Sequence, residues 1–527
     1  MIDLHPLLNF IMDPQFYPFA LITIVHLITW SYSLKGEFVS DDLEGVQKFS
    51  ERYDGGKEEK LDFYEQDVKG EKKKYKVRQF NPHIGFPGSV IRWARLNIGA
   101  KFQEIGKNKK GHSVFGSVQS PFKHHAINLV IHYANLILAY LFLSNVLDPQ
   151  IALMAVLLFA IHPVSCQGVA WISAICYLLS LFWALLSLNV VFLLDNPFIT
   201  VPIVMILTFL SICQLLSGMA NFVIFAFLGF YWEAGGALAV SIFCFITQAM
   251  KVVNFRKDAF KKQHMGRSTY FNIRKPILMI KTFYYYMKLL FFPKRLGLYH
   301  EWGYHYTDKM ERMDWTAAKG LGCLAVIGVL FYFVPELRLG LLWMTVYLAL
   351  FLNVITAQQT VADRYAFIST LGFSIIIAVL LQNSLLAYGI VFGIFIMRTW
   401  VHLPTFNDEV EFYKSNAFNF PKSEVVLGNL GVVYMKNGLQ GMAVDTWQVA
   451  TRLNPDYDVP HYNLFSIFRQ NGNFELARHH LNKCLNSSVC HFPDLWKTEH
   501  GQLANYMELI KPISPNELVQ KMKEANK

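Results

Sequence analysis

Residues 169–194 read VAWISAICYLLSLFWALLSLNVVFLL and contain no Asp, Glu, Lys or Arg. About 20 consecutive apolar residues in a helix cross the hydrocarbon core of a bilayer, so this stretch predicts a membrane span. Similar apolar runs recur from Tyr17 to Leu403, and their hydropathy predicts about eleven spans. The predicted spans are residues 17–34, 125–145, 151–161, 169–194, 199–216, 221–232, 237–253, 317–334, 339–356, 366–386 and 388–401.

The composition of the whole chain also indicates a membrane protein. Of its 527 residues, 53% are hydrophobic and only 16% are charged, whereas ordinary soluble domains carry about 25% charged residues. The charges gather in residues 35–123, in residues 254–275 and after Asn407. The first apolar run has no basic stretch before it and no cleavage site after it, so we expect a retained span and not a signal peptide.

Charge and cysteine content bear on the possible partners. The net charge is +10, but many of the lysines share one loop, residues 35–123, with Glu and Asp. This pattern suits a membrane surface or a phosphate better than nucleic acid. Five of the seven cysteines lie in apolar segments without metal-ligand spacing, and we expect no metal site. Cys484 and Cys490 lie close together in the polar tail and could pair if the tail is extracytoplasmic.

Because the number of predicted spans is odd, residues 35–123 and the tail after Asn407 lie on the same side of the membrane. Residues 51–78 are charged and poor in large aliphatic side chains, which predicts a solvated, partly disordered insertion. Residues 90–102 have the alternation of an interfacial amphipathic helix, and a second amphipathic segment is expected within residues 254–292. The basic stretch 256–275 favours a cytoplasmic position for this side, although basic segments lying on a membrane surface produce the same bias.

The tail contains an internal repeat. Three of its features return after about 34 residues: Asn429-Leu430, Gly438 and Ala443 recur as Asn463-Leu464, Gly472 and Ala477. This is the tetratricopeptide pattern of paired helices, and two units are few, so degenerate or capping units are expected beside them. The sequence thus predicts an all-α fold, with a transmembrane helix bundle in residues 1–404 and a small α-solenoid in residues 405–527.

Short motifs stand in a defined order before the repeat. They are residues 36–42 (GEFVSDD), 121–129 (PFKHHAINL), 162–164 (HPV), 169–173 (VAWIS), 285–293 (YYMKLLFFP) and 362–365 (ADRY). This order resembles the membrane-embedded O-mannosyltransferases with tetratricopeptide repeats, the TMTC type, and their bacterial relatives in the GT-C superfamily. The resemblance covers nearly the whole chain.

The resemblance implies a function and a location. It implies a metal-independent, inverting transfer of a hexose, with mannose favoured, from a polyprenyl-phosphate or dolichyl-phosphate sugar to Ser or Thr of a protein acceptor. No cofactor is expected beyond this lipid-linked donor, and the repeats would bind the acceptor. The loop that begins at Lys35 and the repeats would face the lumen of the endoplasmic reticulum or the periplasm of a bacterium.

The chain departs from this family at several positions. Gln167 stands where the family usually has Glu, and Ile175 and Tyr177 stand where it has Arg and an acid. A Ser-Lys-Glu element of the family appears as Ser217-Gly218-Met219. These differences motivate an alternative function, a non-catalytic membrane-anchored scaffold or assembly factor with the same fold.

Asp41 and Asp42 are the candidate catalytic residues. Glycosyl transfer to a hydroxyl needs a base for the acceptor proton, and these adjacent acids follow the first span, at the depth where a lipid-linked donor presents its head group. One would accept the proton while the other orients the hydroxyl. The alternative is that Ser40-Asp41-Asp42 caps a following helical turn.

Arg364 is the first candidate for the donor phosphate, because its planar guanidinium matches phosphate oxygens. His125, His162 and Arg92 are further candidates, with Asp363, His124 and Tyr365 in supporting positions. Each has a simpler alternative: Arg364 could snorkel or pair with Asp363, the histidines could tie spans together, and Arg92 could face lipid head groups. A transporter is not favoured, because the spans carry few paired ionisable residues and no visible inverted repeat.

Overall fold

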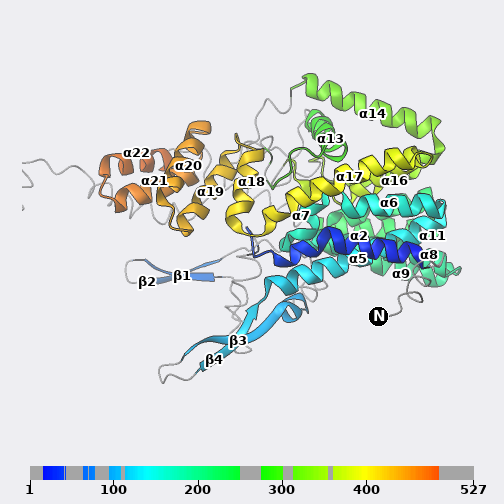
Figure 1. The fold of residues 1–527 in the computed structure, drawn as a ribbon, viewed down its shortest axis with the longest axis horizontal. Helices are drawn as coiled ribbons and strands as arrows, with labels where there is room; N and C mark the ends of the chain where they lie inside the picture. Colours follow the sequence, from blue (N-terminus) through cyan, green and yellow to red (C-terminus); the bar gives the residue numbers. More distant parts are fainter. Residues whose placement is uncertain are drawn as a thin grey trace, which may run out of the picture.

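The structure is a computed structural model that describes residues 16–40, 42, 63–68, 71–76, 94–107, 113–249, 275–298, 300, 312–353 and 360–485. Helices make up most of this part of the chain, as expected, and form a bundle from which further helices extend at one end (Figure 1). Two short antiparallel hairpins are added to the helices. The bundle contains the motifs described above, and the extension contains the repeat.

Six helices in the described residues are long and apolar enough to cross a membrane. The chain is therefore a membrane protein. These helices, some with an adjoining 3-10 turn, are α2 (Tyr17–Trp30), α5 (Pro121–Val146), α8 (Ile175–Leu193), α9 (Pro197–Gln214), α14 (Trp315–Phe333) and α17 (Leu385–His402).

Shorter helices complete the bundle. Helix α6 (Pro149–Ile161) is at its centre: every residue from Ala152 to Ile161 is buried, because α5, α2, α17 and α16 (Ser369–Leu381) pack around it. The others are α7 (Ser165–Ala170), α10 (Asn221–Phe227), α11 (Tyr231–Cys244) and α15 (Arg338–Ala349). Short 3-10 helices η1 (Ser31–Lys35), η3 (Ile172–Ala174), η4 (Leu216–Ala220), η7 (Pro335–Leu337), η8 (Asp363–Ala366) and η9 (Leu403–Phe406) and the π-helix η5 (Phe245–Ala249) connect them.

Local sequence explains where several helices begin. The side chains of Asp148, Asn196 and Asp314 accept hydrogen bonds from the first backbone N–H groups of α6, α9 and α14. Helices leave these N–H groups without intrahelical partners, and short polar side chains satisfy them. Pro149 and Pro197 occupy the first turn of α6 and α9, where the missing N–H costs nothing.

The first loop differs from the prediction. Strands β1 (Phe63–Val68) and β2 (Glu71–Lys76) pair within the segment predicted to be partly disordered, and β3 (Ala100–Lys107) pairs with β4 (Ser113–Gln119). Of the amphipathic helix predicted for residues 90–102, residues 90–93 lie outside the described residues and residues 94–99 are helical. The prediction was wrong beyond residue 99, because Ala100 already pairs with Gln119 in the second hairpin. The later amphipathic segment contains α13 (Lys275–Phe291).

Up to residue 485, where the described part of the chain ends, five helices follow the bundle: α18 (Glu409–Asn419), α19 (Glu424–Lys436), α20 (Gln440–Leu453), α21 (Asp458–Gln470) and α22 (Phe474–Leu485). The recurring Gly438 and Gly472 have positive φ angles of 74° and 73°, which explains a glycine at both turns between paired helices. Gly431 lies against the ring of Trp447, so α19 and α20 approach closely. The repeated residues therefore mark two helix pairs that extend from the bundle (Figure 1).

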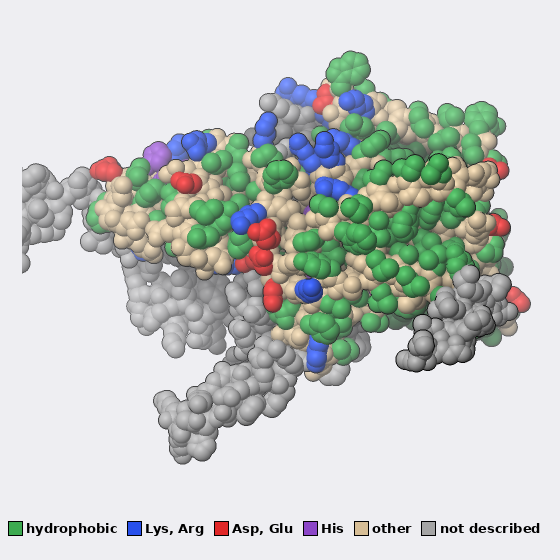
Figure 2. Space-filling view, viewed as in Figure 1, with side chains coloured by type: hydrophobic (Ala, Val, Ile, Leu, Met, Phe, Trp, Pro, Cys, Tyr) green, Lys and Arg blue, Asp and Glu red, His purple; other side chains and the backbone are tan. Residues whose placement is uncertain are grey.

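The side chains on the surface differ between the bundle and the C-terminal helices. On the face shown in Figure 2, hydrophobic side chains cover the bundle, and charged side chains gather toward its ends and over the C-terminal helices. Exposed Leu386, Ile390, Ile394 and Met397 contribute one such apolar stretch along α17. A helix face of this kind is stable in contact with lipid chains.

Candidate functional site

The carboxylate of Asp42 is anchored within the protein. It is fully buried, and its Oδ1 accepts hydrogen bonds from the backbone N of Ser173 at 2.7 Å and from the Ser173 hydroxyl. Its Oδ2 accepts a hydrogen bond from the backbone N of Val39 at 3.3 Å. Asp42 therefore binds the loop after the first span to the turn between α7 and α8.

That turn, residues 171–173, is held from two sides. The indole Nε1 of Trp171 donates to the carbonyl of Val39 at 3.3 Å, a second link to the first loop. From α5, the amide of Asn128 donates to the carbonyls of Val169 and Trp171 at 3.1 and 3.3 Å. The carbonyl of Val169 belongs to the last turn of α7, where carbonyls lack intrahelical partners, so a side-chain amide satisfies it. The carbonyl of Trp171 also accepts from the backbone N of Ala174 at 3.1 Å.

Arg364 approaches the same turn. Its guanidinium carbon lies 5.2 Å from the ring centroid of Trp171 and 4.8 Å from that of Tyr365, within the range of cation–π contacts. The hydroxyl of Tyr177 is a further side-chain partner. The backbone N of Arg364 donates to Oε1 of Gln167 at 2.7 Å, so α7 also positions η8. Asp42 and Arg364, which are far apart in the sequence, thus both contact the Trp171–Ser173 turn.

Tyr365, one of the predicted supporting residues, lies beside Arg364. Besides its contact with Arg364, its ring stacks on Phe351 with centroids 4.9 Å apart and planes inclined by 11°. The stack fixes the ring face that the guanidinium covers.

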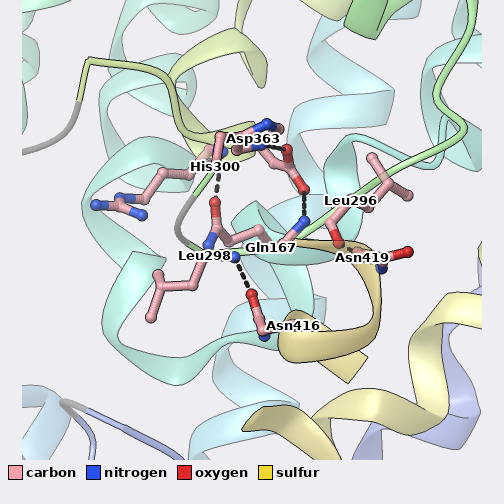
Figure 3. A network of polar contacts seen from close by, with 9 residues as sticks. Gln167, Leu296, Leu298, His300, Asp363, Asn416 and Asn419 are labelled. Atoms are coloured by element: carbon pink, nitrogen blue, oxygen red, sulfur yellow. Dashed lines mark hydrogen bonds and ion pairs between the residues drawn. The ribbon is translucent and has the colours of Figure 1, made fainter. Parts of the chain in front are cut away.

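Asp363 points toward the chain segment that follows α13 (Figure 3). Its Oδ2 accepts from the backbone N of Gly297 at 2.7 Å, and its Oδ1 lies 2.8 Å from Nε2 of His300. Asp363 is almost completely buried, so these partners replace the water that its carboxylate would otherwise need. Its observed role is to hold this segment against η8.

His124 connects two elements of the first loop. Its Nδ1 accepts from Nε of Arg95 at 3.3 Å, so the hydrogen is on Nε2, which lies 2.7 Å from Oε1 of Gln119. Arg95 is itself buried and donates from Nη2 to the carbonyl of Ile172 at 2.7 Å. The Trp171–Ser173 turn is therefore contacted by a second guanidinium.

His125 is buried against the loop that leads to Asp42. The close approach depends on Gly36, because a Cβ there would come within 2.7 Å of Nε2 of His125. His125 thus lies beside the acidic loop, consistent with a place at the edge of the site.

His162 has protein partners at both ring nitrogens. Its Nδ1 accepts from the backbone N of Val164 at 3.2 Å, and its Nε2 lies 3.1 Å from the carbonyl of Leu290 in α13. The rings of Phe373 and Phe395 pack on it. These contacts favour the structural alternative, in which His162 ties α13 to the bundle.

Asp41 and Arg92 lie outside the described residues, as does Cys490. Cys484 is buried, with Sγ 3.7 Å from the carbonyl of Asp458. In the described part of the chain, no three His, Cys, Asp or Glu side chains are grouped so that they could hold a metal ion.

Trp171, Ser173 and Arg95 have roles in the site that were not predicted from the sequence. Trp171 and Ser173 stand in the VAWIS motif, and an indole and a hydroxyl at the end of an apolar run were the available signal. Arg95 was visible only as part of an amphipathic pattern, which does not distinguish a lipid-facing guanidinium from a buried one.

The arrangement suits an anion at a membrane boundary. A guanidinium matches phosphate oxygens in charge and planar geometry, and an acidic loop is bound to the same turn. The fold thus defines a polytopic membrane protein with an acid and a guanidinium beside one interhelical turn. Comparisons with protein families, with curated proteins and with solved structures found no match to this chain.

Proposed function

We propose that the protein transfers a hexose, with mannose favoured, from a polyprenyl-phosphate sugar to a Ser or Thr hydroxyl of a protein acceptor. The observation that supports this most directly is the convergence of Asp42 and Arg364 on the Trp171–Ser173 turn. The resemblance of the motifs at residues 36–42, 169–173 and 362–365 to O-mannosyltransferases supplies the reaction class. These motifs are neighbours in space although they are distant in sequence.

In the proposed chemistry, Asp41 and Asp42 have different roles. The carboxylate of Asp42 already accepts hydrogen bonds at both oxygens, so it is suited to positioning the loop. Asp41 then takes the proton from the acceptor hydroxyl. The hydroxyl oxygen forms a bond to the anomeric carbon as the bond from that carbon to the phosphate oxygen breaks. The leaving phosphate keeps the electron pair, and Arg364 stabilises its charge.

We also propose the finer architecture that this function requires. The shorter helices α6, α10, α11, α15 and α16 correspond to predicted spans and join the six long helices within the membrane, giving about eleven. Helices α19 to α22 are then tetratricopeptide units that bind the acceptor chain. The loop with Asp41 and these units face the lumen of the endoplasmic reticulum or the periplasm.

The test uses purified full-length protein, a synthetic polyprenyl-phosphate mannose and a peptide rich in Ser and Thr. Asp41→Asn should lower kcat at least about a hundredfold, the usual contribution of a general base. Arg364→Lys should lower kcat/KM for the donor, because an ammonium cannot replace the planar fork. The exposed Asp195→Asn and Arg312→Lys variants, outside the site and the C-terminal helices, serve as matched controls and should keep full activity. Full activity in both site variants would reject the proposal.

A second function, the non-catalytic scaffold, is favoured by one observation. A Cβ at Gly218 would lie 2.4 Å from the Ser211 hydroxyl and 2.8 Å from the backbone of Ile212, so the lysine of the family's Ser-Lys-Glu element has no room there. On this alternative, wild-type protein would neither transfer sugar nor show a thermal shift with the lipid-linked donor. Deleting residues 424–485 would instead remove a protein partner.

A further inference from the structure

Helix α18 contacts the first loop. The hydroxyl of Tyr413 lies 3.1 Å from the hydroxyl of Ser40, the residue before Asp41. Just before α18, the carbonyl of Asn407 accepts from the backbone N of Glu37 at 2.8 Å. The buried ring of Tyr413 and this backbone bond therefore fix the chain that leads to the proposed base.

Helix α18 also contacts residues 296–298, the segment that follows α13 (Figure 3). Asn416 accepts from the backbone N of Leu298 at 2.6 Å, and Asn419 donates to the carbonyl of Leu296 at 2.9 Å. The fit at Gly297 is close, since a Cβ there would lie 2.5 Å from Oδ1 of Asn416. The amide of Asn416 is held in turn by donation to the carbonyl of Phe412 at 2.7 Å.

The segment 296–298 continues the connection to the site. The backbone N of Gly297 donates to Asp363, the residue before Arg364, while the neighbouring N of Leu298 donates to Asn416. His300 adds a second link, because its ring contacts Asp363 on one side and Phe420 on the other, with ring centroids 4.4 Å apart in the second case. One helix thus contacts the chain beside the proposed base and, through one backbone segment, the chain beside the proposed phosphate ligand.

Helix α18 also belongs to the C-terminal helices. It packs directly on α19, and Lys436 of α19 lies 3.3 Å from Glu409 of α18. Movement of the helix pairs would therefore be transmitted to α18 through a packed interface. Buried contacts of this kind have discrete arrangements and do not deform continuously.

We infer that α18 is a positioning element, in which Tyr413 and Asn416 hold the acidic loop and the Arg364 turn in one relative arrangement. The catalytic part of this inference, an effect on kcat, rests on the proposed function. The mechanical part, coupling of the acidic loop to the Arg364 turn, does not. Neither residue contacts the substrate. Their contribution is to keep the two halves of the site at the separation that transfer requires.

The mechanical part is tested by hydrogen exchange of full-length protein in lipid nanodiscs. Tyr413→Phe removes one hydroxyl on the first-loop side, and Asn416→Ala removes one amide on the other side. Each should accelerate exchange about two- to tenfold at both the Glu37 amide and the Gly297 amide, from the loss of one hydrogen bond. Lys414→Ala, on the exposed face of the same helix, should change neither.

The decisive result is the effect on the distant side. Suppose that Tyr413→Phe changes the exchange rate of the Glu37 amide alone and that Asn416→Ala changes that of the Gly297 amide alone. The acidic loop and the Arg364 turn are then independent, and the inference is overturned. Amides of α21 and α22 serve as an internal reference, since faster exchange there as well would indicate general unfolding and would also count against it.

The catalytic part is tested by kinetics with polyprenyl-phosphate mannose. Both variants should lower kcat at least about threefold with KM for the donor unchanged, because loss of alignment affects the transition state and not binding. A rise in KM alone would contradict a positioning role. If wild-type protein transfers no sugar, the proposed function fails, whereas the exchange experiment still decides whether α18 couples the two loops.

Discussion

The guanidinium of Arg364 lies 5.2 Å from the ring of Trp171, and the indole N–H of Trp171 binds the carbonyl of Val39 in the first loop. One side chain therefore connects the proposed phosphate ligand with the acidic loop. The ring face provides attraction to the cation, and the N–H provides the link to Val39. These two functions of the indole can be separated by substitution.

Trp171→Phe retains an aromatic face and removes the N–H. We expect it to destabilise the protein by about 1 kcal/mol and to lower transfer activity moderately. Trp171→Leu removes both functions and leaves Arg364 with the ring of Tyr365 but not that of Trp171, so the expected loss is about 3 kcal/mol in stability and more than tenfold in kcat/KM. Thermal unfolding in detergent and donor titration measure the two effects. Equal behaviour of the variants would show that the ring face contributes nothing.

Ser173→Ala removes one of the hydrogen-bond donors to Asp42 and keeps the backbone N–H. Because Asp42 is buried, we expect a loss of stability of about 1–3 kcal/mol. The same substitution in an Asp42→Asn background should lower the stability less, since the charge to which the hydroxyl donates is absent. A double-mutant cycle from thermal unfolding measures this coupling, and additive effects would mean that the hydroxyl and the carboxylate do not interact.

The C-terminal helices should lose stability in mild acid because of a histidine pair. The Nδ1 atoms of His461 and His480 are 2.9 Å apart, and Nε2 of His461 lies 3.1 Å from the carbonyl of Pro455. The carbonyl can only accept, so Nε2 of His461 carries hydrogen and its Nδ1 accepts from His480. Burial, together with His461 and His479, lowers the pKa of His480 to about 4, and burial lowers the pKa of His461.

In the unfolded chain the pKa of histidine is about 6.5, so the unfolded state binds more protons between pH 6.5 and 4. The stability supplied by the neutral pair is therefore complete above about pH 6.5 and is lost as the pH falls toward 4. Hydrogen exchange of α21 and α22 in full-length protein at pH 7 and 5 measures the loss, with rates corrected for intrinsic pH dependence. His480→Gln should reduce this dependence. The exposed His479→Gln variant should keep the pH dependence of the wild-type protein. The same pH dependence in wild-type protein and both variants would contradict a role for the His461–His480 pair.

Close helix packing in the bundle predicts an asymmetry between two glycines. A Cβ at Gly372 of α16 would lie 2.4 Å from the backbone N of Met344 in α15, whereas nothing lies within 4 Å of a Cβ at Gly393 of α17. Gly372→Ala should lower the free energy of unfolding by about 1–3 kcal/mol, because small residues permit helix backbones to approach in a membrane and the added methyl group would separate them. Gly393→Ala should be neutral or stabilising by up to about 1 kcal/mol. Thermal unfolding in the same detergent compares them.

Local composition was sufficient for much of the architecture. The apolar runs that predicted spans form helices in the described residues, because the solvent preference of a helix depends on its own side chains. The glycines that recur in the tail are at turns with positive φ, a requirement that a single residue satisfies. The hairpins were missed because strand pairing depends on a partner segment, and the charged stretch around Phe63–Val68 contains no apolar alternation that would indicate one.

The site could be predicted only in part. Asp42 and Arg364 were visible as polar residues beside apolar runs, but the contacts that bring them together join Asp42 to a residue 131 positions away and Arg364 to one 197 positions away. The same is true of Arg95, whose burial depends on the carbonyl of Ile172. Helix formation and membrane insertion are properties of local stretches of chain, so the amino-acid order specifies them directly. The meeting of the acidic loop, the Trp171–Ser173 turn and α18 is decided by packing between distant segments, which only the folded chain establishes.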